Sequence, residues 1–323
     1  MNEQIKLKCD HFVDNKNKIQ NVFKLSNNML MIATSLVFGD NDVDEEKLSA
    51  CTKYIEKNTN VLSTFQSKSK PIVASKMTLQ NDPEKYFDDV LDVYKILTKK
   101  SPTDTGALVQ AAMIIVESGK KAEAEKIYEK FRDLYSKMNK KHPLITSTDD
   151  ITFGYLLCLT DKSVDKIIEE MECAYEYLNK EVKLKVGKNE IQAISEVLTL
   201  TDGDMKEKCD KVVAIYNAFS DKDVQFANTH TASSMLGILI DLDMENGALV
   251  DEIIEVEKYI KESKGFGKLS LSRKQRLIFA TSLVAEYYCT GSNTATIGAV
   301  SSVVSTVVVQ EIALMMCIFV ALY

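Results

Sequence analysis

Tryptophan is absent from this chain of 323 residues, and arginine is nearly so. The three arginines are Arg132, Arg273 and Arg276. Bidentate hydrogen bonding to phosphate or guanine depends on the guanidinium group of arginine. The net charge is −7, and the lysines form no basic stripe along the sequence. We therefore predict no nucleic-acid partner, by the electrostatic criterion for such proteins.

Proline and glycine are scarce, with 4 and 12 residues respectively. Helical proteins avoid both inside their elements, because proline removes a backbone hydrogen bond and glycine costs conformational entropy. No segment alternates strictly between apolar and polar residues, as a half-buried strand would. The composition thus predicts an all-α protein.

Paired cysteines are lacking as well, since none of the seven forms a Cys-x-x-Cys motif. An odd number of cysteines in apolar, helical surroundings indicates reduced, buried thiols of an intracellular protein. The N-terminal stretch "MNEQIKLKCDHFVDNK" has no basic region followed by an apolar one, so no secretory signal is expected. The predicted location is the cytoplasm.

Catalytic motifs are missing too. "ESGKKAE" (117–123) lacks the upstream glycine and the following Ser or Thr of a P-loop, and "GFGKLS" (265–270) lacks the third glycine of a dinucleotide site. Neither His-Glu-x-x-His nor Gly-x-Ser-x-Gly occurs. We predict no catalytic, cofactor-binding or metal-binding residues from motifs. The alternative is an enzyme whose site is assembled from scattered Asp, Glu, His and Tyr side chains.

What the chain does contain is internal similarity. Five short segments resemble one another, and "VYKIL" (93–97) is the first of them. Their second position is occupied by Tyr94, Tyr128, Tyr175, Tyr216 and Glu257. A second motif ends in aspartates spaced 41 residues apart, namely Asp161, Asp202 and Asp243. Two motifs in one register indicate a structural repeat of about forty residues.

Each repeat is predicted to hold two helices. The first is short and apolar, as in "GALVQAAMIIVES" (106–118), and the second is longer, with apolar residues on one stripe. Such a pair buries its apolar face only against a neighbouring pair. We therefore expect a TPR/HEAT-like solenoid of α-α hairpins over residues 67–290, with N-terminal helices capping the array at 1–66 and an apolar segment at 291–323.

The segment "HPLITSTDD" (142–150) places a histidine near two aspartates. A metal site needs three or four converging ligands, and only His142 and two carboxylates are adjacent here. We interpret the segment as the boundary between two helices. Pro143 follows the first helix, and Ser147 with Asp150 has near capping-box spacing at the start of the second. His230 lies at another predicted helix entry, as a surface or capping residue. The repeated tyrosines, on an apolar stripe, are expected in the core with their hydroxyls at its rim.

The C-terminal stretch at 295–323 is apolar and carries one charge, Glu311. It is long enough to cross a bilayer, which takes about 20 apolar residues. A charge in mid-segment and the lack of flanking lysines or arginines favour instead a helix that caps the solenoid or mediates self-association. Membrane anchoring through 295–323 is the alternative.

Three stretches of the sequence resemble an uncharacterised bacterial family, DUF4003. They are "YIEKNTNVLSTFQS" (54–67), "NDPEKYFDDVLDVYKIL" (81–97) and "KKHPLITSTDD" (140–150). The resemblance implies an all-helical intracellular bacterial protein and no particular activity. Together with the predicted solenoid, it leads us to expect a non-enzymatic helical-repeat protein that binds a protein or peptide. A tail-anchored membrane adaptor is a further alternative.

Overall fold

The computed structural model describes residues 1–24, 27–99, 106–226 and 229–290. The described residues form α-helices and short 3-10 and π turns, with no strand among them. This confirms the all-α prediction. The apolar segment predicted at 295–323 lies outside the described residues. Within them, no helix combines the length and apolar character that spanning a membrane requires.

Two compact units divide the described chain, and the division falls inside α1 and α7. The N-terminal unit comprises residues 7–129, and the C-terminal unit comprises residues 1–6 and 130–290. The helices of the N-terminal half are α1 (Glu3–Phe23), α2 (Asn28–Ser35), α3 (Glu45–Asn58), α4 (Ser69–Thr78), α5 (Pro83–Lys99), α6 (Gly106–Glu117) and α7 (Ala124–Lys141). Those that follow are α8 (Ile151–Leu159), α9 (Val164–Glu176), α10 (Lys188–Thr199), α11 (Met205–Asp221), α12 (His230–Leu239), α13 (Asn246–Lys261) and α14 (Arg273–Thr290).

Buried helices alternate with amphipathic ones along the chain. Nearly every residue of α4, α6, α8, α10 and α12 is buried, whereas α5, α9, α11 and α13 bury one face only. A helix that is apolar all round must be covered on all sides, and the amphipathic helices supply part of that cover. The predicted helices are therefore present, in the predicted order of a buried helix followed by an amphipathic one. That they are copies of one repeat stays a prediction, as do the predicted boundaries at 66 and 290.

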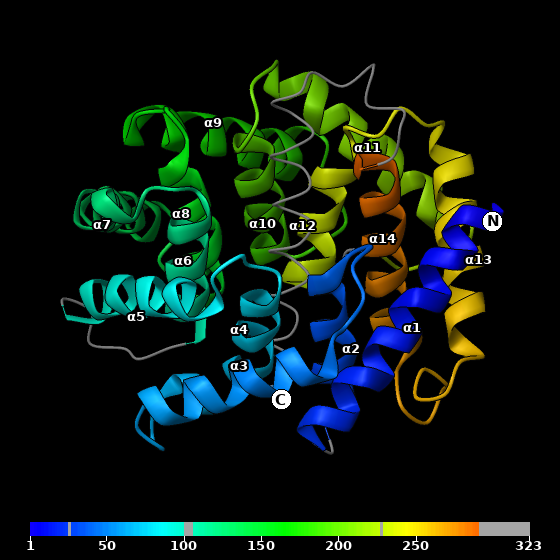
Figure 1. The fold of residues 1–323 in the computed structure, drawn as a ribbon. Helices are drawn as coiled ribbons and strands as arrows, with labels where there is room; N and C mark the ends of the chain where they lie inside the picture. The colour runs from blue at the N-terminus through cyan, green and yellow to red at the C-terminus, as the bar shows by residue number, and fades with distance from the viewer. Residues whose placement is uncertain (25–26, 100–105, 227–228, 291–323) are drawn as a thin grey trace. The chain divides into compact units, whose positions relative to one another are not determined.

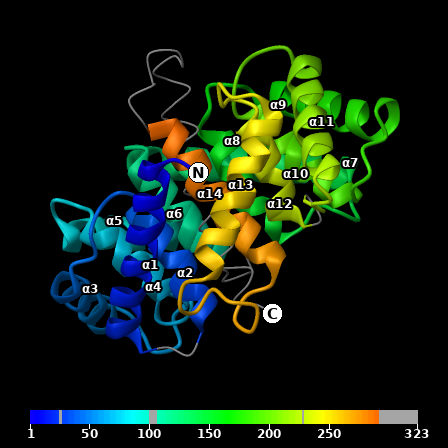
Figure 2. The same ribbon diagram turned by 90° about the vertical axis from the view of Figure 1, so that its right-hand side faces the viewer.

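In the C-terminal unit, α10 packs along α12, and α13 packs against α14 (Figures 1 and 2). Gly237 lets α12 approach α10 closely, because a Cβ at this position would lie 2.8 Å from Val197 Cγ1. On the amphipathic layer, α11 contacts both α9 and α13. Glu196 and His230 are thereby brought to the same interior.

Lysine side chains cap the C-terminal ends of two buried helices in this unit. Lys130 Nζ donates to the carbonyl oxygens of Cys158 and Thr160, at 3.0 and 2.9 Å. Lys208 Nζ donates to those of Leu198 and Thr201, at 2.8 and 2.6 Å. These carbonyls have no partner within their own helices, and the cations also favour the negative end of the helix dipole. These two lysines thereby supply donors at the C-terminal ends of α8 and α10.

The repeated tyrosines occupy the positions expected of them. Tyr94, Tyr128 and Tyr175 are buried, and Tyr216 is half-buried with its hydroxyl donating to the Lys185 carbonyl at 3.1 Å. The fifth position, Glu257, is buried as well. Its Oε1 accepts from Arg276 Nε at 2.6 Å, so this departure from the tyrosine pattern is matched by a buried ion pair. The core prediction is confirmed for Tyr94, Tyr128 and Tyr175, whereas Tyr216 is only half-buried.

Candidate metal centre

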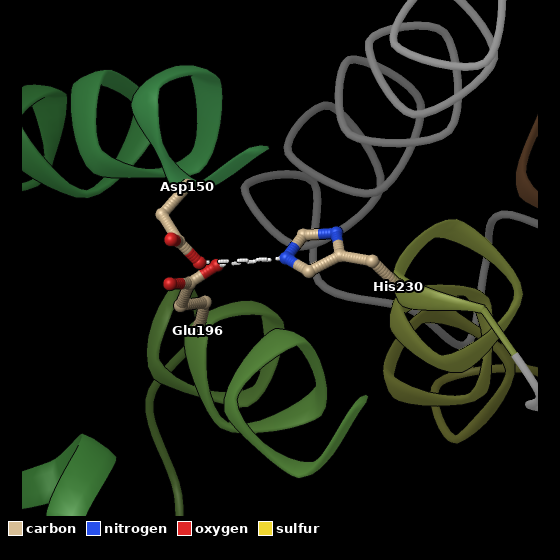
Figure 3. Close-up of side chains that lie close together, drawn as sticks. All are labelled: Asp150, Glu196 and His230. Carbon is tan, nitrogen blue, oxygen red and sulfur yellow. Dashed lines mark ion pairs between the residues drawn. The ribbon is translucent and has the colours of Figure 1, made fainter. Parts of the chain in front are cut away.

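Three ionisable side chains converge inside the C-terminal unit. His230 Nε2 lies 3.4 Å from Asp150 Oδ1 and 4.0 Å from Glu196 Oε2, and one ligand atom from each residue lies within 4.8 Å of the others (Figure 3). Asp150 and Glu196 are fully buried, and His230 is 8% exposed. Residues of the buried helices α10 and α12 and the N-cap of the buried helix α8 thus meet at one point.

Asp150 reaches the cluster from the start of α8. Its Oδ2 accepts the Ser147 backbone N–H at 2.6 Å, which is one arm of a capping box. The predicted helix boundary at Ser147 and Asp150 is therefore present, and Pro143 follows the end of α7 as expected. Because a carboxylate has two oxygens, Oδ1 is still available to face Gln192 and His230. The prediction missed this second role.

Glu196 belongs to a polar pair on α10. Gln192 lies one helical turn before it, at i and i+4, and the two share a face of the helix. Gln192 Nε2 donates to Asp150 Oδ1 at 2.9 Å and lies 3.4 Å from Glu196 Oε1. The amide thus holds both carboxylates in place. It plays the outer-shell part that commonly orients metal-binding carboxylates.

His230 is the first residue of α12, and Thr229 is the N-cap, accepting from the Ala232 N–H. The predicted helix entry is confirmed, but the expectation of a surface or capping side chain is wrong. The ring is buried beside Phe153, at 5.9 Å between ring centroids, and Nε2 makes no hydrogen bond. The same nitrogen faces the carboxylates of Asp150 and Glu196.

The charge balance of the cluster favours a cation. Burial alone raises the pKa of Asp150, but the neighbouring His230 and Glu196 side chains and the Ser147 N–H outweigh it, and the pKa lies below its usual value. The cluster holds two carboxylic acids and one imidazole, so acidic groups outnumber the basic one. A divalent ion among them would offset that excess, and buried charges otherwise carry a large desolvation cost.

The distances also fit an ion. Metal–ligand bonds of about 2.1 Å put neighbouring ligand atoms about 3.0 Å apart in an octahedral shell and about 3.4 Å apart in a tetrahedral one. The 3.4 Å between His230 Nε2 and Asp150 Oδ1 matches the tetrahedral value. The 4.0 Å to Glu196 Oε2 closes to that value with a rotamer adjustment of a few tenths of an ångström. One imidazole and two carboxylates suit Zn²⁺, Fe²⁺ or Mn²⁺.

The other two histidines lie elsewhere. His142 Nε2 is 2.9 Å from Glu172 Oε1, and its ring stands 4.3 Å from that of Tyr175. His11 Nε2 is 3.1 Å from Asp42 Oδ1 in the N-terminal unit. His142 and Asp150, which both belong to the segment "HPLITSTDD", therefore contact different residues.

A half-open cavity of about 680 Å³ opens elsewhere in the C-terminal unit. Its wall includes Lys185, Glu190, Tyr216, Asp223 and Phe226. Phe226 stacks on Phe219 at 4.3 Å between centroids, which fixes the apolar side. One of the repeated tyrosines therefore lines a surface cavity as well as contributing to the core.

Comparison with known proteins gives a family and no activity. The chain is 21% identical over 153 residues to the "Uncharacterized protein YeaA" of Bacillus subtilis (strain 168). The aligned part covers 46% of this chain and 46% of YeaA, so less than half of that relative is spanned. No solved structure matches. Residues 15–313 match the family described as "Protein of unknown function (DUF4003)", which confirms the resemblance seen in the sequence. The chain belongs to the DUF4003 family.

Proposed function

We propose that this protein binds one divalent transition-metal ion at the cluster of Asp150, Glu196 and His230. The observation that carries the proposal is the convergence of their ligand atoms within 4.8 Å at buried positions. The buried Nε2 of His230 is the second support, because it makes no hydrogen bond and a buried polar atom without one is costly. A bound ion would accept the lone pair of that nitrogen.

The role of the ion is to join three hairpins. Glu196 and His230 belong to α10 and α12, and Asp150 is the N-cap of α8, so a bound ion would link these three helices where they meet. An ion that binds only the folded state stabilises it by about 2.7 kcal/mol when its concentration is 100 times Kd. For a unit of roughly this size that corresponds to a rise in Tm of about 5–10 °C. A clamp of this kind fits a scaffold better than it fits an enzyme, since the ligands are buried.

Metal analysis of the purified full-length chain tests the proposal. After dialysis against micromolar Zn²⁺, Mn²⁺ or Fe²⁺ and removal of loose ions, we expect one equivalent to remain. Glu196→Gln and His230→Gln should retain none, and their Tm should not respond to metal. Glu172→Gln and His142→Gln are matched controls, because they alter the other His–Glu pair of the same unit. Wild-type protein that retains no ion under any of these conditions contradicts the proposal.

Binding of a protein or peptide partner is the second function we propose. The alternation of buried and amphipathic helices supports stacked repeats, and stacked repeats present extended surfaces. The cavity beside Tyr216 supports it further, because it combines an aromatic ring with charges of both signs. Peptides selected from a displayed library on wild-type protein should lose binding to Tyr216→Ala and keep it to Tyr54→Ala, whose tyrosine lies in the N-terminal unit. Equal binding to both variants would move the partner site elsewhere.

A further inference from the structure

Gln192 holds a position that its hydrogen bonds do not fully explain. Its side chain is 1% exposed, and Nε2 donates toward the carboxylates of Asp150 and Glu196. The other end of the same amide, Oε1, is buried and makes no hydrogen bond. A glutamine used only as a donor therefore leaves its better acceptor bare inside the protein, which is unfavourable.

The shape of the amide suggests how this is resolved. Oxygen and nitrogen of a glutamine amide exchange places when the group turns by 180°, with little change in packing. The place now taken by Nε2 is 2.9 Å from Asp150 Oδ1 and 3.4 Å from Glu196 Oε1. Asp150 Oδ1 is also the oxygen that lies 3.4 Å from His230 Nε2, and Glu196 Oε1 belongs to the carboxylate whose Oε2 lies 4.0 Å from the same nitrogen. An oxygen in that place would lie beside both carboxylates of the cluster.

We infer that Gln192 is the fourth protein ligand of the ion, through Oε1, and that its amide turns when the metal binds; this rests on the proposed metal site. Without the ion, the two carboxylates need the amide N–H groups to offset their charge. With the ion present, the cation offsets that charge, and a hard or borderline cation takes an amide oxygen and not an amide nitrogen. The resulting set of one nitrogen and three oxygens favours Mn²⁺, Fe²⁺ or Zn²⁺ over Cu⁺, which prefers sulfur ligands.

The experiment compares wild type, Gln192→Leu and Gln192→Glu, with Gln110→Leu as a buried-glutamine control in the N-terminal unit. Zn²⁺ affinity is measured by competition with a chromophoric chelator, and the ligand field is read from the visible spectrum of the Co²⁺-loaded proteins. We expect Gln192→Leu to bind Zn²⁺ at least about tenfold more weakly and to change the Co²⁺ spectrum. Gln192→Glu should retain one ion, and Gln110→Leu should match wild type in both readouts.

A measurement on the unaltered protein covers the case in which Gln192→Leu does not fold. The side-chain ¹⁵NH₂ signal of Gln192, assigned by its loss in Gln192→Glu, should shift on saturation with diamagnetic Zn²⁺. Three outcomes overturn the inference while leaving the metal site intact: an unshifted signal, an unchanged Zn²⁺ affinity in Gln192→Leu, or weaker affinity with an unchanged Co²⁺ spectrum. Wild-type protein that retains none of Zn²⁺, Co²⁺, Mn²⁺ and Fe²⁺ overturns the metal site and the inference together.

Discussion

Replacing Gly237 with alanine tests the packing that brings α10 and α12 together. The added Cβ would lie 2.8 Å from Val197 Cγ1 and 3.0 Å from Val197 Cβ. Favourable carbon–carbon contacts need about 3.5–4.0 Å, so the contact with Val197 Cγ1 would be roughly 0.7 Å too short. Turning Val197 moves Cγ1 but leaves Cβ in place, and valine in a helix has one strongly preferred rotamer. The helices themselves must therefore separate.

The size of the effect follows from two opposing terms. Overpacking a well-filled core costs about 1–3 kcal/mol, whereas glycine to alanine inside a helix contributes up to about 1 kcal/mol of stability. We expect Gly237→Ala to lower the free energy of unfolding by about 1 kcal/mol, with the cost of overpacking exceeding the gain in helix propensity. The corresponding fall in Tm is about 2–4 °C for a unit of this size. Because Glu196 adjoins Val197, Zn²⁺ affinity should fall as well.

Urea unfolding of a double-mutant cycle provides the assay. In a Val197→Ala background the methyl groups are gone and only the Cβ at 3.0 Å remains, so Gly237→Ala should cost less than in wild type, with a coupling of at least about 0.5 kcal/mol between the sites. Gly247→Ala is the control, since its nearest neighbour is the flexible Glu245 carboxylate at 3.0 Å and a change within about 0.5 kcal/mol is expected. If Gly237→Ala stabilises the wild-type protein, or adds to Val197→Ala without coupling, the close packing inferred here does not exist.

Three further predictions concern burial. Glu257→Ala leaves Arg276 buried without its carboxylate, so urea unfolding should show a loss of about 3–5 kcal/mol; a loss below about 1 kcal/mol would contradict a buried pair. Burial raises the pKa of the Cys158 thiol to about 12 while Cys173 is exposed, so peptide mapping after brief iodoacetamide treatment should find Cys173 modified and Cys158 intact. The lowered pKa of Asp150 means that its ionised form contributes stability above about pH 4, which is lost as the pH falls through the folded-state pKa. In metal-free protein, the stability difference between wild type and Asp150→Asn should therefore narrow below about pH 4 and persist at neutral pH.

The helices were predictable from local sequence because their signals are local. Pro83 begins α5, where the missing N–H of proline has no cost, and Asp204 is the N-cap of α11. Apolar segments such as 106–118 became buried helices with boundaries close to those predicted. Periodicity and capping depend on residues within one or two turns, so a single sequence contains the information they need.

The cluster was not predictable in the same way. Asp150, Glu196 and His230 are not separated by the 41-residue interval of the repeated motifs, so the repeat does not align them. Their meeting depends on how α8, α10 and α12 pack, which is long-range information. One signal was present in the sequence: Gln192 and Glu196 share a face within a segment whose apolar character predicts burial. An acidic residue at such a position requires a charged or hydrogen-bonding partner, and a buried histidine on a neighbouring helix is one way to meet that requirement.

Asp150 can both cap a helix and belong to the cluster because its carboxylate has two oxygens. A capping box uses one carboxylate oxygen, and here Oδ2 accepts the Ser147 N–H while Oδ1 turns toward Gln192 and His230. The cap fixes the carboxylate's orientation before any ion arrives, which lowers the entropic cost of organising a ligand. A residue that ends one loop is thereby a rigid, preoriented member of the cluster. The local role of Asp150 thus supplies the precision that its proposed role in metal binding demands.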